Sequence, residues 1–174
     1  MNQNDKIVLM SCCAPCSCGA ISQLKEQGVD FIVLFYNPNI FPETEYQKRL
    51  NEQIKYCKNL DVKYYVGDYN HNEWLKCVNG LESEPERGKR CMECFKMRFV
   101  WGARWAQNNG YNKIMSVFGV SKHKNQNQVD VAAIDLGLKY IPFKWDEQKR
   151  KKINQESDFY RQNYCGCEFS QKIN

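Results

Sequence analysis

Two short and almost unbroken runs of apolar residues lie near the start of the chain, at residues 6–11 and 31–36. Runs of this length are typical of strands that are covered on both faces, as in a parallel sheet. Weaker runs predict three further strands at residues 63–66, 113–117 and 139–143. We therefore expect a five-stranded sheet.

Segments with helical character separate these runs. Gly28 and Gly137 end two predicted helices, at residues 19–27 and 125–136, because glycine readily adopts the backbone conformation found just after a helix. The other predicted helices span residues 42–60, 71–78 and 90–109. Strands that alternate with helices imply right-handed crossover connections. The sequence therefore predicts one α/β domain over residues 1–174, with a doubly wound, mainly parallel sheet and helices on both faces.

The chain shows no sign of export or membrane insertion. Residues 1–5 are polar, and the apolar run at residues 7–10 is too short for a signal peptide. No stretch approaches the roughly 20 apolar residues that a membrane-spanning helix requires. We expect a cytoplasmic protein that has no membrane partner.

Basic residues are unevenly distributed, although the net charge is only +5. One cluster comprises Lys144, Lys149, Arg150, Lys151 and Lys152, with Lys122 and Lys124 upstream. A basic patch suits a polyanion such as a nucleic acid. A solvated helix face is an equally good interpretation from charge alone.

Ten cysteines are many for a cytoplasmic protein, in which disulfides do not persist. They form the groups Cys12-Cys13-x-x-Cys16-x-Cys18, Cys91-x-x-Cys94 and Cys165-x-Cys167, with Cys57 and Cys77 standing alone. Cysteines separated by two residues can direct their sulfur atoms at one centre, and thiolates suit zinc and iron–sulfur clusters. The grouping therefore predicts a metal site.

Two of these groups should converge in space. The first follows the carboxyl end of strand one, where doubly wound sheets place their ligand crevice. Cys91 and Cys94 open a helix that leads into strand four, so its start should lie at the same edge, and its dipole would favour thiolates. Cys165 and Cys167 join them only if the tail folds back, because the topology alone would carry the tail away.

Other residues have simpler interpretations. Cys18, Cys57 and Cys77 lie on predicted helices and are expected to be small buried hydrophobic residues. His71 and His123 lie in polar stretches and are expected to be solvated. Residues 11–19 hold cysteines and Pro15 where a nucleotide-binding relative would carry glycines, so we do not expect ATP to bind there.

Four segments carry a family resemblance. Ser11-Cys12-Cys13-Ala14-Pro15-Cys16-Ser17 resembles the N-terminal signature of the cobalamin-independent epoxyqueuosine reductases, the QueH family. Matching segments follow in the family's order: Phe35-Tyr36-Asn37-Pro38-Asn39-Ile40 with Glu45-Tyr46 and Arg49, Arg90-Cys91-x-x-Cys94-Phe95-x-x-Arg98, and Tyr160-Arg161-Gln162-x-Tyr164-Cys165-Gly166-Cys167. Residues 116–127 depart from the Thr/Ser-rich segment that the family would carry there.

The resemblance implies a nucleotide alpha-hydrolase-like fold whose C-terminal helical tail folds back over the active-site edge. It also implies the reduction of epoxyqueuosine to queuosine at the wobble position of tRNA, the last step of queuosine synthesis. Removing the epoxide oxygen takes two electrons and two protons, so an electron donor, not identified by the sequence, is a further expected partner.

The resemblance implies a four-iron, four-sulfur cluster beside a second, mononuclear iron. We assign Cys12, Cys13, Cys91 and Cys94 to the cluster, and Cys16, Cys165 and Cys167 to the second iron. Glu45, Tyr46 and Arg161 are candidates for substrate contact or proton delivery, although they could equally tie helices to the sheet.

Two rival functions remain. An iron–sulfur-dependent tRNA sulfur transferase would share this kind of sheet but needs ATP. A zinc-stapled RNA-binding module would use four of the cysteines in a closed tetrahedral site without catalysis.

Overall fold

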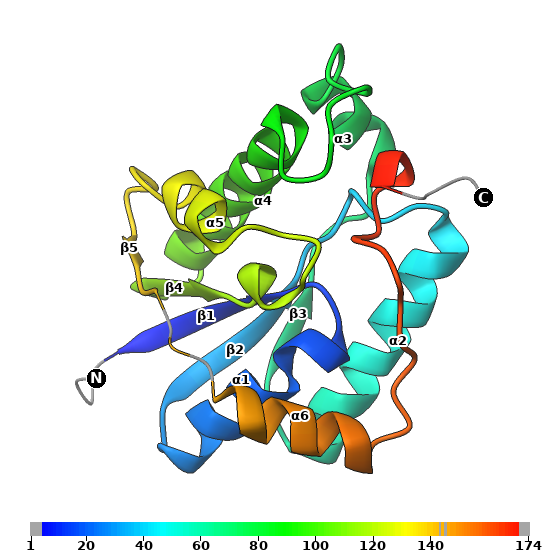
Figure 1. Cartoon of the computed structure of the whole chain (residues 1–174). Coiled ribbons are helices and arrows are strands. Elements are labelled where there is room, and N and C mark those ends of the chain that lie inside the picture. The colour runs from blue at the N-terminus through cyan, green and yellow to red at the C-terminus, as the bar shows by residue number, and fades with distance from the viewer. Residues whose placement is uncertain (1–4, 143, 145, 171–174) are drawn as a thin grey trace.

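A computed structural model describes residues 5–142, 144 and 146–170 of the protein. Its strands are β1 (Lys6–Ser11), β2 (Asp30–Phe35), β3 (Tyr64–Val66), β4 (Lys113–Ser116) and β5 (Lys139–Tyr140). They form one parallel sheet in the order β3-β2-β1-β4-β5 (Figure 1). The predicted five-stranded parallel sheet is confirmed, although β5 is shorter than expected and residue 143 lies outside the described residues.

Helices cover both faces of this sheet (Figure 1). They are α1 (Ala14–Glu26), α2 (Glu43–Asn59), α3 (His71–Cys77), α4 (Lys89–Asn108), α5 (Gln126–Ala132) and α6 (Glu147–Glu156). Side chains alternate along β1, so that Ile7 and Leu9 join the core beneath α1 and α2. Val8 and Met10 join the core beneath α4 and α5. The doubly wound α/β arrangement is therefore also confirmed.

Two helix boundaries differ from the predicted ones. Helix α1 begins at Ala14 and not at residue 19, because Pro15 is tolerated in a first turn, where its missing N–H would have no helical partner. As a result Cys16 and Cys18 lie on the helix. Helix α5 ends at Ala132 and not at residue 136, since the chain turns there and Asp135 adopts a left-handed conformation with φ of 60°.

The strand order creates a crevice between β1 and β4. The connection after β1 leads toward β2, whereas the one after β4 leads toward β5, so the two loops diverge at the carboxyl edge. The first loop leads into Cys12 and Cys13. The second contains a short 3-10 helix, Phe118–Val120, and continues to the start of α5.

The C-terminal tail folds back over this edge, as predicted. Helix α6 packs on α1, and the chain then runs without regular structure to a short 3-10 helix at Glu168–Ser170 (Figure 1). The backbone N–H of Phe41 donates to the Gly166 carbonyl at 2.8 Å, which ties the tail to the loop before α2. Only part of the tail is helical. Among the described helices, none is long and apolar enough to cross a lipid bilayer.

Candidate metal centre

The sulfur atoms of Cys12, Cys13 and Cys16 all lie within 4.8 Å of one another; we call these residues the β1 thiol group. Cys12 and Cys13 are buried, and Cys16 is half-buried. The backbone of Cys13 is extended, and the first turn of α1 brings Cys16 back over it, with the Cys16 N–H donating to the Cys13 carbonyl at 3.2 Å. Three sulfur donors therefore converge at the end of β1.

Helix α2 supports this loop with a buried amide. Gln53 Oε1 accepts hydrogen bonds from Ser11 Oγ at 2.7 Å and from Ser17 Oγ at 2.9 Å. The same amide donates through Nε2 to Cys57 Sγ at 3.4 Å. Because Ser11 and Ser17 flank the cysteines, this network holds the thiol-bearing turn against α2.

The other clustered cysteines form a second set, Cys91, Cys94, Cys165 and Cys167, which we call the α4–tail thiol group. Cys94 and Cys167 pack in one buried cluster with Trp74. Cys165 lies close enough to both Cys91 and Cys94 to influence their pKa, so the tail cysteine is near the start of α4. Burial raises the pKa of Cys91 to about 11 and that of Cys167 to about 12.

Arg49 joins the tail to the β1 thiol group. Its side chain is 2% exposed, its Nε pairs with Glu45 Oε1 at 2.6 Å, and its Nη1 donates to the Cys165 carbonyl at 3.0 Å. The guanidinium also lies 5.1 Å from the ring centre of Tyr164. The remaining nitrogen, Nη2, is buried without a hydrogen-bond partner among the described residues. Arg49 thus retains one free donor at the cleft wall.

His71 and an aromatic stack hold the far end of the tail. The His71 ring lies between the Pro38 carbonyl and Glu168 Oε1, at 2.8 Å from each. It stacks on Trp74, which in turn stacks on Phe169. Aromatic contacts therefore dock the tail at Phe169, and Tyr164 donates through its hydroxyl to the Phe41 carbonyl at 2.9 Å.

The prediction that both histidines are solvated is wrong. His71 is 12% exposed and pairs with Glu168, whereas His123 is 19% exposed and lies 3.3 Å from Glu86 Oε2. Their polar neighbours in sequence suggested exposure, but contacts distant along the chain cover both rings. His123 also lines the cleft described next.

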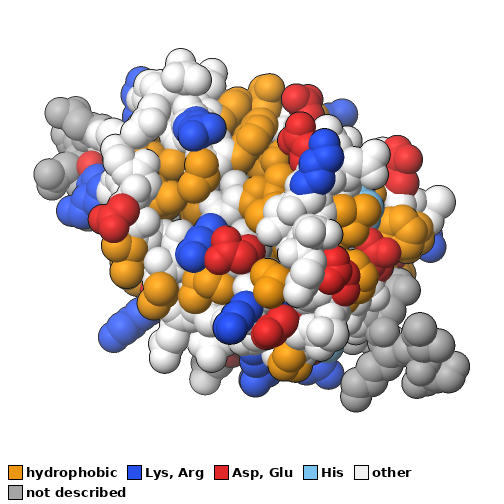
Figure 2. All heavy atoms as spheres, turned by 90° about the horizontal axis from the view of Figure 1, so that it is seen from above, with side chains coloured by type: hydrophobic (Ala, Val, Ile, Leu, Met, Phe, Trp, Pro, Cys, Tyr) orange, Lys and Arg blue, Asp and Glu red, His pale blue; other side chains and the backbone are white. Residues whose placement is uncertain are grey.

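A cleft of about 720 Å³ opens over the β1 thiol group. Its walls come from the loop after β1, the loop between β4 and α5, the start of α6 and the tail. The charged side chains that line it are Arg49, Arg87, Lys122, Lys124, Glu147, Arg150 and Arg161. Cations outnumber the single carboxylate, so the cleft is electropositive. By contrast, the face seen from above carries basic and acidic side chains interspersed with hydrophobic ones (Figure 2).

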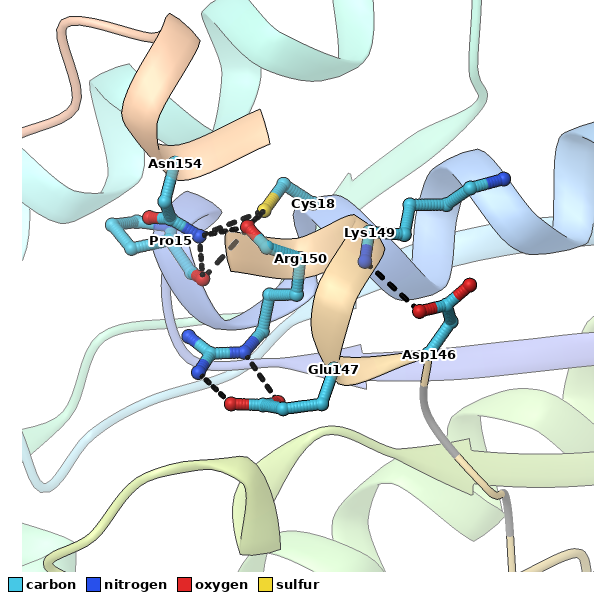
Figure 3. A network of polar contacts seen from close by, with 7 residues as sticks. All are labelled: Pro15, Cys18, Asp146, Glu147, Lys149, Arg150 and Asn154. Carbon is cyan, nitrogen blue, oxygen red and sulfur yellow. Dashed lines mark hydrogen bonds and ion pairs between the residues drawn. The ribbon is translucent and has the colours of Figure 1, made fainter. Parts of the chain in front are cut away.

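The basic cluster on α6 is largely paired. Lys149 pairs with Glu26. Arg150 contacts Glu147 at 2.5 Å (Figure 3). Lys152 approaches Glu156 at 4.0 Å. These pairs reduce the positive charge available on the helix surface, and the stronger excess of cations lies along the cleft.

Helix α6 also braces the start of α1 (Figure 3). Asn154 Nδ2 donates to the Pro15 carbonyl at 3.0 Å and to Cys18 Sγ at 3.2 Å. Gly19 lets the helices approach closely, because a Cβ at this position would lie 2.8 Å from Arg150 Cβ. Cys18 is therefore a fully buried packing residue, as predicted, and so is Cys57. Cys77 is only half-buried.

The three predicted catalytic candidates lie in different surroundings. Arg161 lines the cleft and donates to the Asn154 carbonyl at 2.9 Å. Glu45 is buried between Arg49 and the hydroxyl of Tyr160, which donates to it at 2.8 Å. Tyr46 is buried and stacks on Tyr69, with ring centres 4.1 Å apart. Neither Glu45 nor Tyr46 is among the cleft-lining residues.

Sequence reasoning missed the buried polar residues around the thiols, chiefly Gln53, Arg98 and Lys124. All three are less than one-tenth exposed. Lys124 was grouped only with the surface charges, because nothing in its neighbours along the chain indicates burial. Arg98 was part of the family motif, which gave its position without its role.

The residues of this site fit a thiolate-bound metal centre. The β1 thiol group and Cys165 line one cleft, and Cys94 and Cys167 pack in one buried cluster. Thiolates are the usual ligands of iron–sulfur clusters. The unpaired Nη2 of Arg49 and the buried cations nearby suit a negatively charged group. Fold and site together define a doubly wound α/β protein with a group of thiols that could hold a metal ion.

Comparison with known proteins identifies the family. The family described as "Epoxyqueuosine reductase QueH" matches residues 7–173. A protein of that name from Acinetobacter baylyi is 38% identical over 175 residues, which cover 95% of this chain and 80% of the relative. Its namesake from Haemophilus influenzae is 37% identical over 176 residues, covering 96% and 72%. The chain belongs to the epoxyqueuosine reductase QueH family.

Solved structures share the fold at low sequence identity. A U34-tRNA thiolase, NcsA, from Methanococcus maripaludis, solved with its [4Fe-4S] cluster, has a TM-score of 0.64 at 13% identity, covering 98% of this chain and 63% of that one. A predicted subunit of a tRNA methyltransferase from Methanocaldococcus jannaschii has a TM-score of 0.58 at 12% identity, covering 87% and 75%. At these identities the likeness supports the α/β fold class alone.

Proposed function

We propose that this chain reduces epoxyqueuosine to queuosine at the wobble position of tRNA in the cytoplasm, the last step of queuosine synthesis. The observation that carries the proposal is that the β1 thiol group and Cys165 line an electropositive cleft, in a chain whose relatives are named epoxyqueuosine reductases. The reaction removes the epoxide oxygen as water and leaves an alkene. It consumes two electrons from a redox donor and two protons.

We further propose that the thiols hold a four-iron, four-sulfur cluster and a second iron. Distances favour a division other than the one expected from sequence spacing, because Cys16 lies with Cys12 and Cys13. We therefore assign the β1 thiol group to one centre and the α4–tail thiol group to the other. Bound there, the iron centres would supply electrons to the substrate and Lewis-acid polarisation of its epoxide.

The chain itself binds and orients the nucleoside. A volume of about 720 Å³ is within the usual range for a small-molecule site, so a nucleoside turned out of the anticodon loop fits. Arg161 and Lys122 line the opening and can pair with backbone phosphates. Glu45 and Tyr46 then act by holding Arg49 and α2 in place, and the proton donors are among the cleft-lining groups.

The deciding experiment is a turnover assay with anaerobically purified protein, dithionite as reductant, and tRNA that carries epoxyqueuosine. Mass spectrometry of the digested tRNA should show queuosine, which has one oxygen atom fewer. The protein should be brown and should contain iron, whereas a zinc-stapled module would be colourless.

Matched cysteine variants sharpen this assay. Cys94→Ser should lose iron and turnover, because Cys94 lies in the α4–tail thiol group. Cys57→Ser should keep both and lose only stability, on the order of 1–3 kcal/mol, because Cys57 contacts the core and Gln53. Full iron content and turnover in Cys94→Ser would refute the assigned centre. Thiolated tRNA formed only with ATP would favour a sulfur transferase instead.

A further inference from the structure

Two buried cations beside the thiols have no carboxylate partner. Arg98 is fully buried, and its guanidinium donates to the Tyr36 carbonyl and to Asn37 and lies 3.5 Å from the ring centre of Phe118. Lys124 is 7% exposed, and its Nζ lies 5.4 Å from the centre of the same ring. Among the described residues no Asp or Glu forms an ion pair with either side chain.

An unpaired buried cation is costly, because the protein interior solvates charge poorly. Neighbouring aromatic faces and carbonyl groups offset only part of this cost. The structure therefore carries an excess of positive charge that an anion must balance. Thiolates are the anions that the surrounding residues can supply.

Lys124 lies in the cleft that residues of both thiol groups line. Cys12 and Cys16 of the β1 thiol group and Cys165 of the α4–tail thiol group line the same cleft as Lys124. The charge of Lys124 therefore stands beside the substrate site.

The backbone holds Lys124 in this position. Its N–H donates to the Ser121 carbonyl at 3.0 Å, which closes a turn. The next residue, Asn125, caps α5 by accepting the N–H of Asn127 at 2.9 Å. The side chain therefore projects from a fixed turn between the cleft and Phe118, whereas Lys122 in the same loop is exposed.

We propose that Lys124, backed by Arg98, sets the reduction potential of the metal–thiolate centre by stabilising its reduced form. This inference rests on the proposed iron centre. Each electron that the centre accepts adds one negative charge. A fixed cation in a poorly screened interior favours the more negative state, since net charge and burial are main determinants of cluster potentials. Lys124 thereby makes the centre easier to reduce by the electron donor.

The test is a redox titration of anaerobically prepared protein, followed by visible absorption and electron paramagnetic resonance. Lys124→Met removes the charge while keeping an unbranched side chain. At a fixed potential the ratio of reduced to oxidised centre should fall about tenfold, which corresponds to about 59 mV for a one-electron couple. Lys124→Arg retains the charge and should restore the wild-type ratio.

Lys122→Met is the matched control, because it removes the same charge from an exposed position in the same loop, where water and salt screen it. Its reduction potential should match that of the wild type. A Lys124→Met protein with full iron content and an unchanged potential would overturn the inference. If Lys124→Met loses its iron, the Lys124→Arg variant becomes the test. Loss of iron from Lys124→Arg, or a lowered reduction potential in it, also overturns the inference.

These experiments distinguish failure of this inference from failure of the proposed function. Wild-type protein that lacks iron or fails to convert epoxyqueuosine defeats the function. An unchanged potential in Lys124→Met, with wild-type turnover intact, defeats only the role of Lys124.

Discussion

Cys12, Cys13 and Cys16 lie close enough for hydrogen bonds between their sulfur atoms to shift their pKa values in different directions. As a thiolate, Cys12 accepts hydrogen bonds from Cys13 and then Cys16, which holds the pKa of Cys12 well below its ordinary value. The hydrogen bond with Cys12 is the largest cause that raises the pKa of Cys13 well above its ordinary value and that of Cys16 to about 12, and burial raises both further. Cys12 is therefore the first of the three to ionise and the first available to a metal ion.

Gly166 shows how one residue without a side chain places two sulfur atoms. Its φ is +115°, a conformation that residues with a Cβ rarely adopt. A Cβ there would lie 2.9 Å from Arg49 Nη1 and 3.1 Å from Ile40 Cγ1. Glycine thus allows the turn between Cys165 and Cys167 to press against α2.

Gly166→Ala should therefore displace the tail. Backbone strain of about 1–3 kcal/mol and the contact with Arg49 should lower the melting temperature and the iron content together. Gly80→Ala is the matched control, because Gly80 also has a positive φ, of 79°, but nothing lies within 4 Å of its added Cβ. Gly80→Ala should lose some stability while keeping its iron. Equal iron content in the two variants would show that the tail position does not matter for metal binding.

At the level of elements, the tail and the start of α4 depend on each other. Cys167 packs with Cys94 and Trp74 in one buried cluster, separate from the two cores that flank the sheet. The sheet contacts of β1 to β5 do not involve residues after α6. The tail therefore lines the cleft and covers Cys94 without forming part of the sheet.

A chain in which both Cys165 and Cys167 are replaced by Ser should fold yet fail to convert epoxyqueuosine. Serine keeps the size of each side chain but removes the thiolate that binds soft metals. Circular dichroism should match that of the wild type, and mass spectrometry of the treated tRNA should show no queuosine. Wild-type turnover by this variant would mean that the metal site is complete without the tail.

At the scale of the whole molecule, positive charge is concentrated in the cleft. The basic cluster on α6 was a candidate contact for a nucleic acid, but its Lys149, Arg150 and Lys152 have carboxylate partners. Lys122 and Arg161 line the opening of the cleft and make no ion pair among the described residues. Phosphates of a bound tRNA are thus best placed along the cleft rim.

Binding of tRNA should weaken steeply with salt, because basic side chains that neutralise phosphates release counterions. Replacing Lys122 and Arg161 with Ala should weaken binding at low salt and reduce the log–log salt slope by about 0.7 to 0.9 per lost contact. Replacing Lys149 and Lys152 with Ala should change the slope far less. Filter binding at several salt concentrations measures both. A larger loss from the α6 pair would place the tRNA over that helix.

Local sequence was enough to predict the strands and the general position of the site. Apolar runs identify β1 and β2 because a buried parallel strand needs apolar residues on both faces. The alternation of strands and helices then implies the sheet, and the position of Cys12 and Cys13 after β1 implies the crevice. The division of the cysteines into clustered and isolated residues could also be predicted from the sequence, since the members of each cluster are only a few residues apart in the chain.

Tertiary structure alone decided which distant residues meet. The grouping of Cys94 with Cys167, the enclosure of His71 between Pro38 and Glu168, and the burial of Lys124 all depend on contacts between segments far apart in sequence. Such contacts are set by how the whole chain packs, and no short window of sequence records them. The sequence by itself therefore determined the α/β fold and the thiol chemistry, whereas the partners and charge of each group followed from the packed structure.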